Sequence, residues 1–188
     1  MKKLVVIAAA VLLFSGVGYA NDLNIKAGFD AFGNLETKAK GGYTSNDIIR
    51  TGFSLAGEYL IPLMSVVKIG GGLEYQFMRT GKKYDNAKIG YVPVYATIQI
   101  NPINSCDGIY FKGNVGYSAI FRFDPRNRNE TTGGLYYGLG TGYDFKSGLI
   151  LEMMYGMYTG TVNYRNAGGE ADFNYSKLGF NIGYKFKV

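Results

Sequence analysis

Apolar and polar side chains alternate with a period of two along most of the chain after residue 22. This period places successive side chains on opposite faces of a β-strand, so each run predicts a strand with one apolar face. The runs predict eight strands, at about residues 23–37, 48–60, 66–79, 88–100, 109–123, 134–145, 149–159 and 173–188. The sequence therefore predicts an all-β fold.

The connections between these predicted strands alternate in length. Residues 61–65, 101–108 and 146–148 are short connections, whereas residues 38–47, 80–87, 124–133 and 160–172 are longer or more polar. Short turns at one end and long loops at the other are typical of barrels that span an outer membrane. An even number of strands also returns both chain ends to the same side. We predict an eight-stranded antiparallel up-and-down transmembrane β-barrel.

The two faces of the predicted strands differ in chemistry. One face carries Ile, Leu, Val, Phe, Tyr and Met, and the other carries glycine, serine and charged residues. A water-soluble barrel is the alternative, but it would have to fit the large apolar face into a small interior. A membrane barrel turns that face to lipid and keeps small and charged side chains within the lumen. We predict that side chains fill the lumen, with a salt-bridge network of Lys26, Arg50, Glu58, Lys68, Glu74, Lys112 and Glu152.

The beginning of the chain predicts export. Lys2 and Lys3 precede an unbroken apolar run over residues 4–14, and small residues follow before Asn21. The run is shorter than the roughly 20 residues of a membrane-spanning helix, so we predict a cleavable signal peptide at 1–20 and a barrel domain at 21–188. Cys106 is the only cysteine and is expected to be an inert thiol. The net charge of +6 is spread without a basic run, so nucleic acid is not an expected partner.

Composition argues against catalysis. The chain has no histidine, which removes the commonest general acid–base and metal-ligating side chain. We therefore predict no enzyme activity, cofactor or metal, although carboxylate-only chemistry with Glu58, Glu74 and Glu152 stays open. A narrow porin-like channel for small solutes or ions is the alternative function. It is disfavoured because an eight-stranded barrel is just wide enough for side chains to fill.

The loops offer another class of function. Residues 124–134 and 160–172 are polar and flexible in composition, and they contain Arg126, Arg128 and Arg165. Arginine suits acidic ligands such as lipopolysaccharide, glycans or a host surface. Simple solvated loops are the alternative. We favour a structural or adhesin-like surface role in the bacterial outer membrane, with its lipid and lipopolysaccharide as partners.

The chain ends on the alternating run "NIGYKFKV". Asn181, Gly183, Phe186 and Val188 resemble the C-terminal assembly signal of outer-membrane barrels, although that signal usually ends on phenylalanine. The segments "GYVPVYATIQI" and "YFKGNVGYSAIF" are similar to segments common in the OmpA/OmpX and opacity-type family of small barrels. This resemblance implies the same eight-stranded fold and recognition by the barrel-assembly machinery. Because an open sheet edge is costly in lipid, the last strand is expected to pair with the first.

Overall fold

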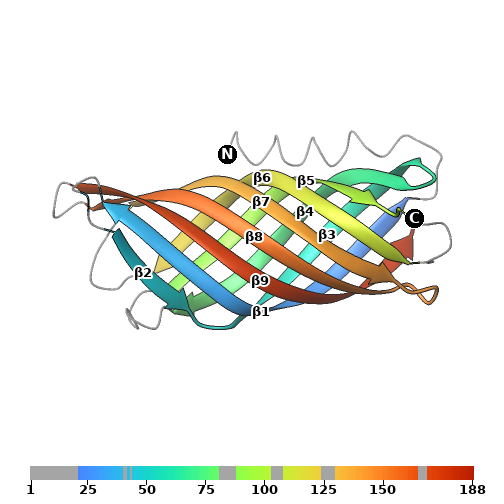
Figure 1. Cartoon of the computed structure of the whole chain (residues 1–188), viewed down its shortest axis with the longest axis horizontal. Helices are drawn as coiled ribbons and strands as arrows, with labels where there is room; N and C mark the ends of the chain where they lie inside the picture. The colour runs from blue at the N-terminus through green and yellow to red at the C-terminus, as the bar shows by residue number, and fades with distance from the viewer. Residues whose placement is uncertain are drawn as a thin grey trace.

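The computed structural model describes residues 21–39, 42, 44–80, 88–102, 108–123, 130–164 and 169–188. They form a single antiparallel sheet (Figure 1). Its strands are β1 (Asp22–Ala39), β2 (Thr44–Ile49), β3 (Gly52–Met64), β4 (Val67–Thr80), β5 (Lys88–Ile100), β6 (Ile109–Phe123), β7 (Glu130–Asp144), β8 (Leu149–Tyr164) and β9 (Gly169–Lys187). These described residues include no helix long and apolar enough to cross a membrane.

The sheet closes on itself. From β3 to β9 each strand pairs with the next, and β1 pairs with both β3 and β9. Residues Asn21 and Val188 exchange two backbone hydrogen bonds of 3.0 and 2.9 Å, so the pairing reaches the last residue. Closure satisfies the backbone groups that an open edge would leave unpaired.

Strands β2 and β3 are two parts of one barrel strand. The pairs Gly33↔Ile49 and Asp30↔Gly52 belong to the same register against β1, which is interrupted only around Arg50 and Thr51. The closed wall therefore has eight strands with one extra segment, and the predicted eight-stranded antiparallel barrel is confirmed.

The two ends of the barrel differ. The β3–β4, β5–β6 and β7–β8 connections and the chain end at Val188 lie at what we name the turn end, at the right of Figure 1. The facing ends of β1 and β2, β4 and β5, β6 and β7, and β8 and β9 lie at the opposite end, which we name the loop end. This separation of short and long connections agrees with the arrangement predicted from the sequence.

The outer face of the barrel is apolar. Leu139, Phe53 and Ile182 are 71%, 64% and 54% exposed, and aliphatic and aromatic side chains on every barrel strand share this outward position. The polar residues that follow outward-facing ones are buried in the lumen. Ser54, which follows Phe53, and Lys26, which follows the exposed Ile25, are examples. An apolar exterior around a polar interior is the arrangement expected of a barrel in lipid.

Four irregularities interrupt the regular strand pairing towards the loop end. The register shifts in β1 between Asp30 and Phe32, in β4 between Gln76 and Arg79 and in β7 between Gly133 and Tyr136, and the β2/β3 strand is interrupted at Arg50. An extra residue in a strand turns the following side chains to the opposite face.

The interruption of the β2/β3 strand decides which residue enters the lumen there. Ile49 is 4% exposed, whereas Arg50 is exposed. This corrects the assignment of Arg50 to the lumen network, which assumed an unbroken period of two through this strand.

Candidate functional site

Four charged side chains form a closed ring across the lumen. Lys26 of β1 lies 2.7 Å from both Glu58 Oε1 and Glu152 Oε1, on β3 and β8. Lys112 of β6 lies 2.6 Å from Glu58 Oε2 and 2.8 Å from Glu152 Oε2. Each carboxylate therefore accepts from two lysines, and all four side chains are at most 3% exposed. We name these residues the four-charge ring.

Neutral side chains complete the hydrogen bonding of the ring. The Tyr95 hydroxyl donates to Glu58 at 2.8 Å, and the Tyr110 hydroxyl donates to Glu152 at 3.0 Å. The Asn181 amide also donates to Glu152, at 2.9 Å. Buried charges are tolerated only when they are paired and hydrogen-bonded, so these contacts explain how four charges can occupy the interior.

Glycine makes room for the side chains that cross the lumen. A methyl group at Gly72 would lie 2.6 Å from the ring of Tyr95 and 2.8 Å from the side chain of Glu58. At Gly52 it would lie 2.7 Å from the guanidinium of Arg79. These three distances are too short for a carbon contact, so glycine at both positions permits the inward packing of larger neighbours.

A second charged cluster lies further towards the loop end. Arg79 Nη1 lies 2.5 Å from Asp30, and Lys177 Nζ lies 3.0 Å from Asp30 and 2.7 Å from Glu74. We name Asp30, Glu74, Arg79 and Lys177 the Asp30 cluster. Arg79 enters the lumen only because the irregularity in β4 turns it inward.

Tyrosines fill the lumen around the Asp30 cluster and beyond it. Tyr91 and Tyr175 are stacked, with ring centroids 4.9 Å apart and an angle of 8° between the ring planes. The ring centroids of Tyr136 and Tyr158 lie 4.8 Å apart. We name these four residues, each at most 3% exposed, the tyrosine layer. The layer is joined to polar neighbours because Gln76 donates to the Tyr158 hydroxyl at 2.6 Å and Arg79 donates to that of Tyr175 at 3.2 Å.

Apolar side chains complete the filling at the loop end. They belong to the same buried cluster as the tyrosine layer, and we name them the apolar cap: Ile49, Ile120, Val162 and Phe173. Leu35 and Ile89 pack against this cluster and are partly buried. The lumen therefore changes from charged to aromatic to aliphatic along its length.

A chain of ion pairs closes the turn end. Asp22 lies 2.7 Å from Lys187 Nζ and 2.8 Å from Lys68 Nζ. Asp144 lies 2.8 Å from Lys185 Nζ and 3.8 Å from Lys68 Nζ. Lys68 thus joins the two aspartates, and the five residues link β1, β4, β7 and β9.

The space left inside the described lumen is small. A cavity of about 20 Å³ lies between the four-charge ring and the Asp30 cluster, with Asn114, Tyr136 and Met154 among the residues that line it. This is close to the volume that a single water needs. Side chains of the described residues therefore leave little space around this cavity.

Comparison with solved structures identifies the fold. No protein-family model and no curated protein matches the chain. The structure of outer membrane protein AlkL in DMPC lipid bilayers is similar, with a TM-score of 0.55 and 16% identity over 93% of this chain and 94% of that chain. The chain has the fold of the small eight-stranded outer-membrane β-barrels.

Two further outer-membrane barrels show the same similarity. OprG from Pseudomonas aeruginosa has a TM-score of 0.52 and 14% identity over 90% of this chain and 97% of that chain. Neisserial surface protein A has a TM-score of 0.53 and 10% identity over 87% of this chain and 97% of that chain. Together with the apolar outer face, this fold supports an outer-membrane location.

The structure brings together some of the residues predicted for the lumen network and separates others. Lys26, Glu58, Lys112 and Glu152 form the four-charge ring. Glu74 belongs to the Asp30 cluster and Lys68 to the ion pairs at the turn end. The predicted network is therefore divided into three levels.

Other predicted residues have different outcomes. Asn181, Gly183, Phe186 and Val188 lie on or directly after β9, and Gly183 pairs with Lys26 of β1. The remaining predictions fall outside the described residues: the signal peptide at 1–20, Cys106, Arg126, Arg128 and Arg165.

The predicted salt-bridge network left out several lumen residues. Asp30 and Lys177 follow the alternation of their strands, so the period of two contained the signal for them. Arg79 gave no such signal, because it stands an odd number of residues after the inward-facing Gln76 and enters the lumen through an irregularity.

The ring carboxylates are poorly suited to catalysis. Glu58 and Glu152 each accept hydrogen bonds from two lysines and one tyrosine, which occupy the oxygen lone pairs a general base would use. The described part of the chain has no group of three or more His, Cys, Asp or Glu residues arranged to hold a metal.

Proposed function

We propose that the protein is a closed outer-membrane barrel with a structural or surface-interaction role, without catalysis and without a cofactor. The observation that carries this proposal is the filled lumen. A solute that crossed the barrel would have to pass the ion pairs at the turn end, the four-charge ring, the Asp30 cluster, the tyrosine layer and the apolar cap.

The energetic cost of opening this lumen favours a closed barrel. Displacing one member of a buried ion pair costs about 3–5 kcal/mol because it leaves a buried charge without its partner. In the four-charge ring each lysine contacts both carboxylates, so a displacement breaks two contacts at once.

A narrow channel is the second candidate function. The polar lumen lining favours it, since buried polar side chains lie at several levels, among them Asp22, Glu58 and Gln76. The apolar cap argues against it, because Ile49, Ile120, Val162 and Phe173 offer no hydrogen bonds to a passing ion.

The conductance of the refolded barrel in a planar bilayer tests the proposal. Only protein whose gel mobility shifts on heating is used, so that unfolded chains do not contribute. We expect a sealed bilayer for the natural protein. A general porin refolded in the same bilayer is the positive control for detecting a current. Steady, reproducible conductance of the natural barrel would overturn the closed-lumen proposal and support the channel.

The proposed surface role assigns ligand binding to the loops. Arg126, Arg128 and Arg165 stand in connections between strands that meet at the loop end, and their charge suits acidic lipopolysaccharide or glycans. We expect the variant with all three changed to glutamine to bind purified lipopolysaccharide more weakly, by roughly fivefold per arginine lost.

The control for the loop variant removes charge at the opposite end. Lys146→Gln with Lys187→Gln should leave lipopolysaccharide binding unchanged in a vesicle where only the loop end is accessible. Equal binding by the loop variant and the natural protein would contradict the assignment of the ligand to these arginines.

A further inference from the structure

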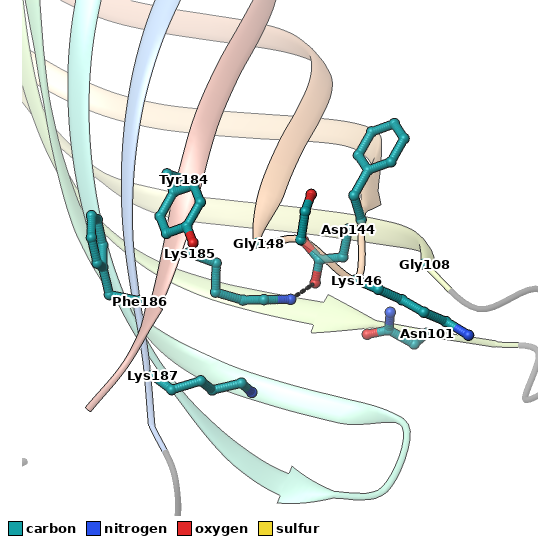
Figure 2. A pocket seen from close by; sticks show the side chains of 11 residues that line it. Asn101, Gly108, Asp144, Lys146, Gly148, Tyr184, Lys185, Phe186 and Lys187 are labelled. Atoms are coloured by element: carbon teal, nitrogen blue, oxygen red, sulfur yellow. Dashed lines mark hydrogen bonds and ion pairs between the residues drawn. The ribbon is translucent and has the colours of Figure 1, made fainter.

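A depression of about 590 Å³ lies at the turn end of the barrel (Figure 2). It is formed where the β7–β8 turn meets the end of β9, with Asn101 from the end of β5 at its edge. Figure 2 shows Lys185 directed across it towards Asp144, with Lys146 beside them. Its volume lies within the range of small-ligand sites.

The depression carries an excess of positive charge. Lys68, Lys185 and Lys187 share only Asp22 and Asp144 as their carboxylate partners in the ion-pair chain at the turn end. Lys185 and Lys187 line the depression together with Asp144, and Lys146 lies beside them. In the ion-pair chain of the described residues, three lysines therefore face two aspartates.

Part of this charge remains open to solvent. Lys187 contacts Asp22 at 2.7 Å, yet its side chain is 63% exposed. A lysine ammonium has three donors, so a single carboxylate contact leaves others free to bind an anion.

Aromatic side chains border the depression on the outer face. Tyr184 and Phe186 line it and are 47% and 43% exposed, and their ring centroids lie 4.9 Å apart. Figure 2 shows both rings on the strand that carries Lys185 and Lys187. One wall is thus apolar and belongs to the lipid-facing surface, while the other is cationic.

We propose that this depression binds the phosphate headgroup of an anionic phospholipid in the membrane leaflet at the turn end. The lysines match the charge of the phosphate, and Tyr184 and Phe186 match the adjoining glycerol and acyl region. An acidic protein segment would match the lysines alone and would leave the aromatic wall in contact with lipid. The inference rests on the membrane location and not on whether the lumen conducts.

Retention of lipid by the refolded full chain tests the site. The protein in detergent micelles is titrated with phosphatidylglycerol or phosphatidylcholine, and bound lipid is counted by native mass spectrometry on heat-modifiable material. We expect preferential retention of phosphatidylglycerol. Lys187→Gln should weaken that retention about fivefold, and Lys146→Gln with Lys187→Gln should weaken it further. Lys187→Arg should keep most of it.

The matched control is Lys38→Gln. Lys38 is 58% exposed, close to the 63% of Lys187, but it lies at the other end of the barrel beside Glu36. Equal retention by Lys187→Gln and Lys38→Gln, or equal retention of the two lipids, would overturn the proposal.

Two further arms distinguish other sources of anionic charge. Inorganic phosphate at matched ionic strength should not displace phosphatidylglycerol, because it lacks the apolar portion; complete displacement would mean that the site takes free phosphate. Capture of polyglutamate that depends on Lys187, without retention of phosphatidylglycerol, would assign the depression to an acidic protein segment. Either outcome would overturn the lipid proposal.

Discussion

Near the turn end, the lumen is filled by Lys26, Glu58, Lys112 and Glu152; near the loop end, it is filled by tyrosines and aliphatic side chains. Both regions are almost fully buried. In the four-charge ring, each group depends on specific partners at 2.6–2.8 Å. In the tyrosine layer and apolar cap, most of the contact is between rings and aliphatic groups.

The difference shows two ways of closing a narrow barrel. Paired charges make closure specific, because the loss of one partner leaves a buried charge uncompensated. In the tyrosine layer and apolar cap, closure depends on the volume of the packed side chains, and the apolar surroundings keep ions out. The Asp30 cluster joins the two regions, with Arg79 contacting both Asp30 and the hydroxyl of Tyr175.

The largest expected effect comes from unbalancing the four-charge ring. Lys112→Met keeps a similar volume but leaves Glu58 and Glu152 to share Lys26. We expect the free energy of unfolding to fall by about 3–5 kcal/mol. Urea unfolding of the barrel in vesicles, followed by gel mobility, measures this change.

A double-mutant cycle sharpens that measurement. Glu58→Gln with Lys112→Met leaves Lys26 paired with Glu152, so the ring again has a net charge of zero. The double variant should therefore lose at least about 1 kcal/mol less free energy of unfolding than the sum of the two single changes. Simple additivity would show that the charges are not coupled and would contradict the ring as a unit.

A smaller loss of stability is expected at Arg79, which faces the lumen, and almost none at Arg50, which is exposed. Arg79→Gln removes one of the cations bound to Asp30 and a donor to Tyr175, and we expect a loss of about 2 kcal/mol. Arg50→Gln changes an exposed side chain and should stay within about 0.5 kcal/mol of the natural barrel. The opposite ranking in the same urea experiment would mean that the alternation continues unbroken and that Arg50 faces the lumen.

A small effect on stability is also expected at the outer face of the turn end. Phe186→Asp puts a charge near the membrane boundary, where it should cost about 0–1 kcal/mol. We expect the amount of folded protein in the outer membrane to fall much further, because Phe186 belongs to the proposed assembly signal read by the barrel-assembly machinery.

Phe145→Asp provides the matched comparison. Phe145 is 37% exposed and Phe186 is 43% exposed, but only Phe186 lies in the C-terminal pattern. Immunoblotting of heat-modifiable protein in outer-membrane fractions compares the two variants. Equal levels of the two folded variants in the outer membrane would contradict the proposed C-terminal assembly signal.

Much of the fold could be predicted because a period of two places lipid-facing and lumen-facing side chains alternately along each strand of a membrane barrel. Lys26 and Ile25 are neighbours in sequence, and the strand turns one to the lumen and the other to lipid. The same pattern found Glu58, Lys112 and Glu152, although not that they would meet in one ring. Which lumen residues meet depends on the tilt and stagger of strands around the barrel, and neither is visible in a single strand.

The sequence by itself determined the strand number, the lipid-facing side of each strand and the closure of the last strand on the first. These follow from local alternation and from the need to satisfy every backbone group in lipid. Only the tertiary structure decided that Ile49 and Arg79 enter the lumen and that the charges divide into three levels. One extra residue in a strand reverses the side chains that follow it, and side chains from distant strands meet only when the sheet has closed.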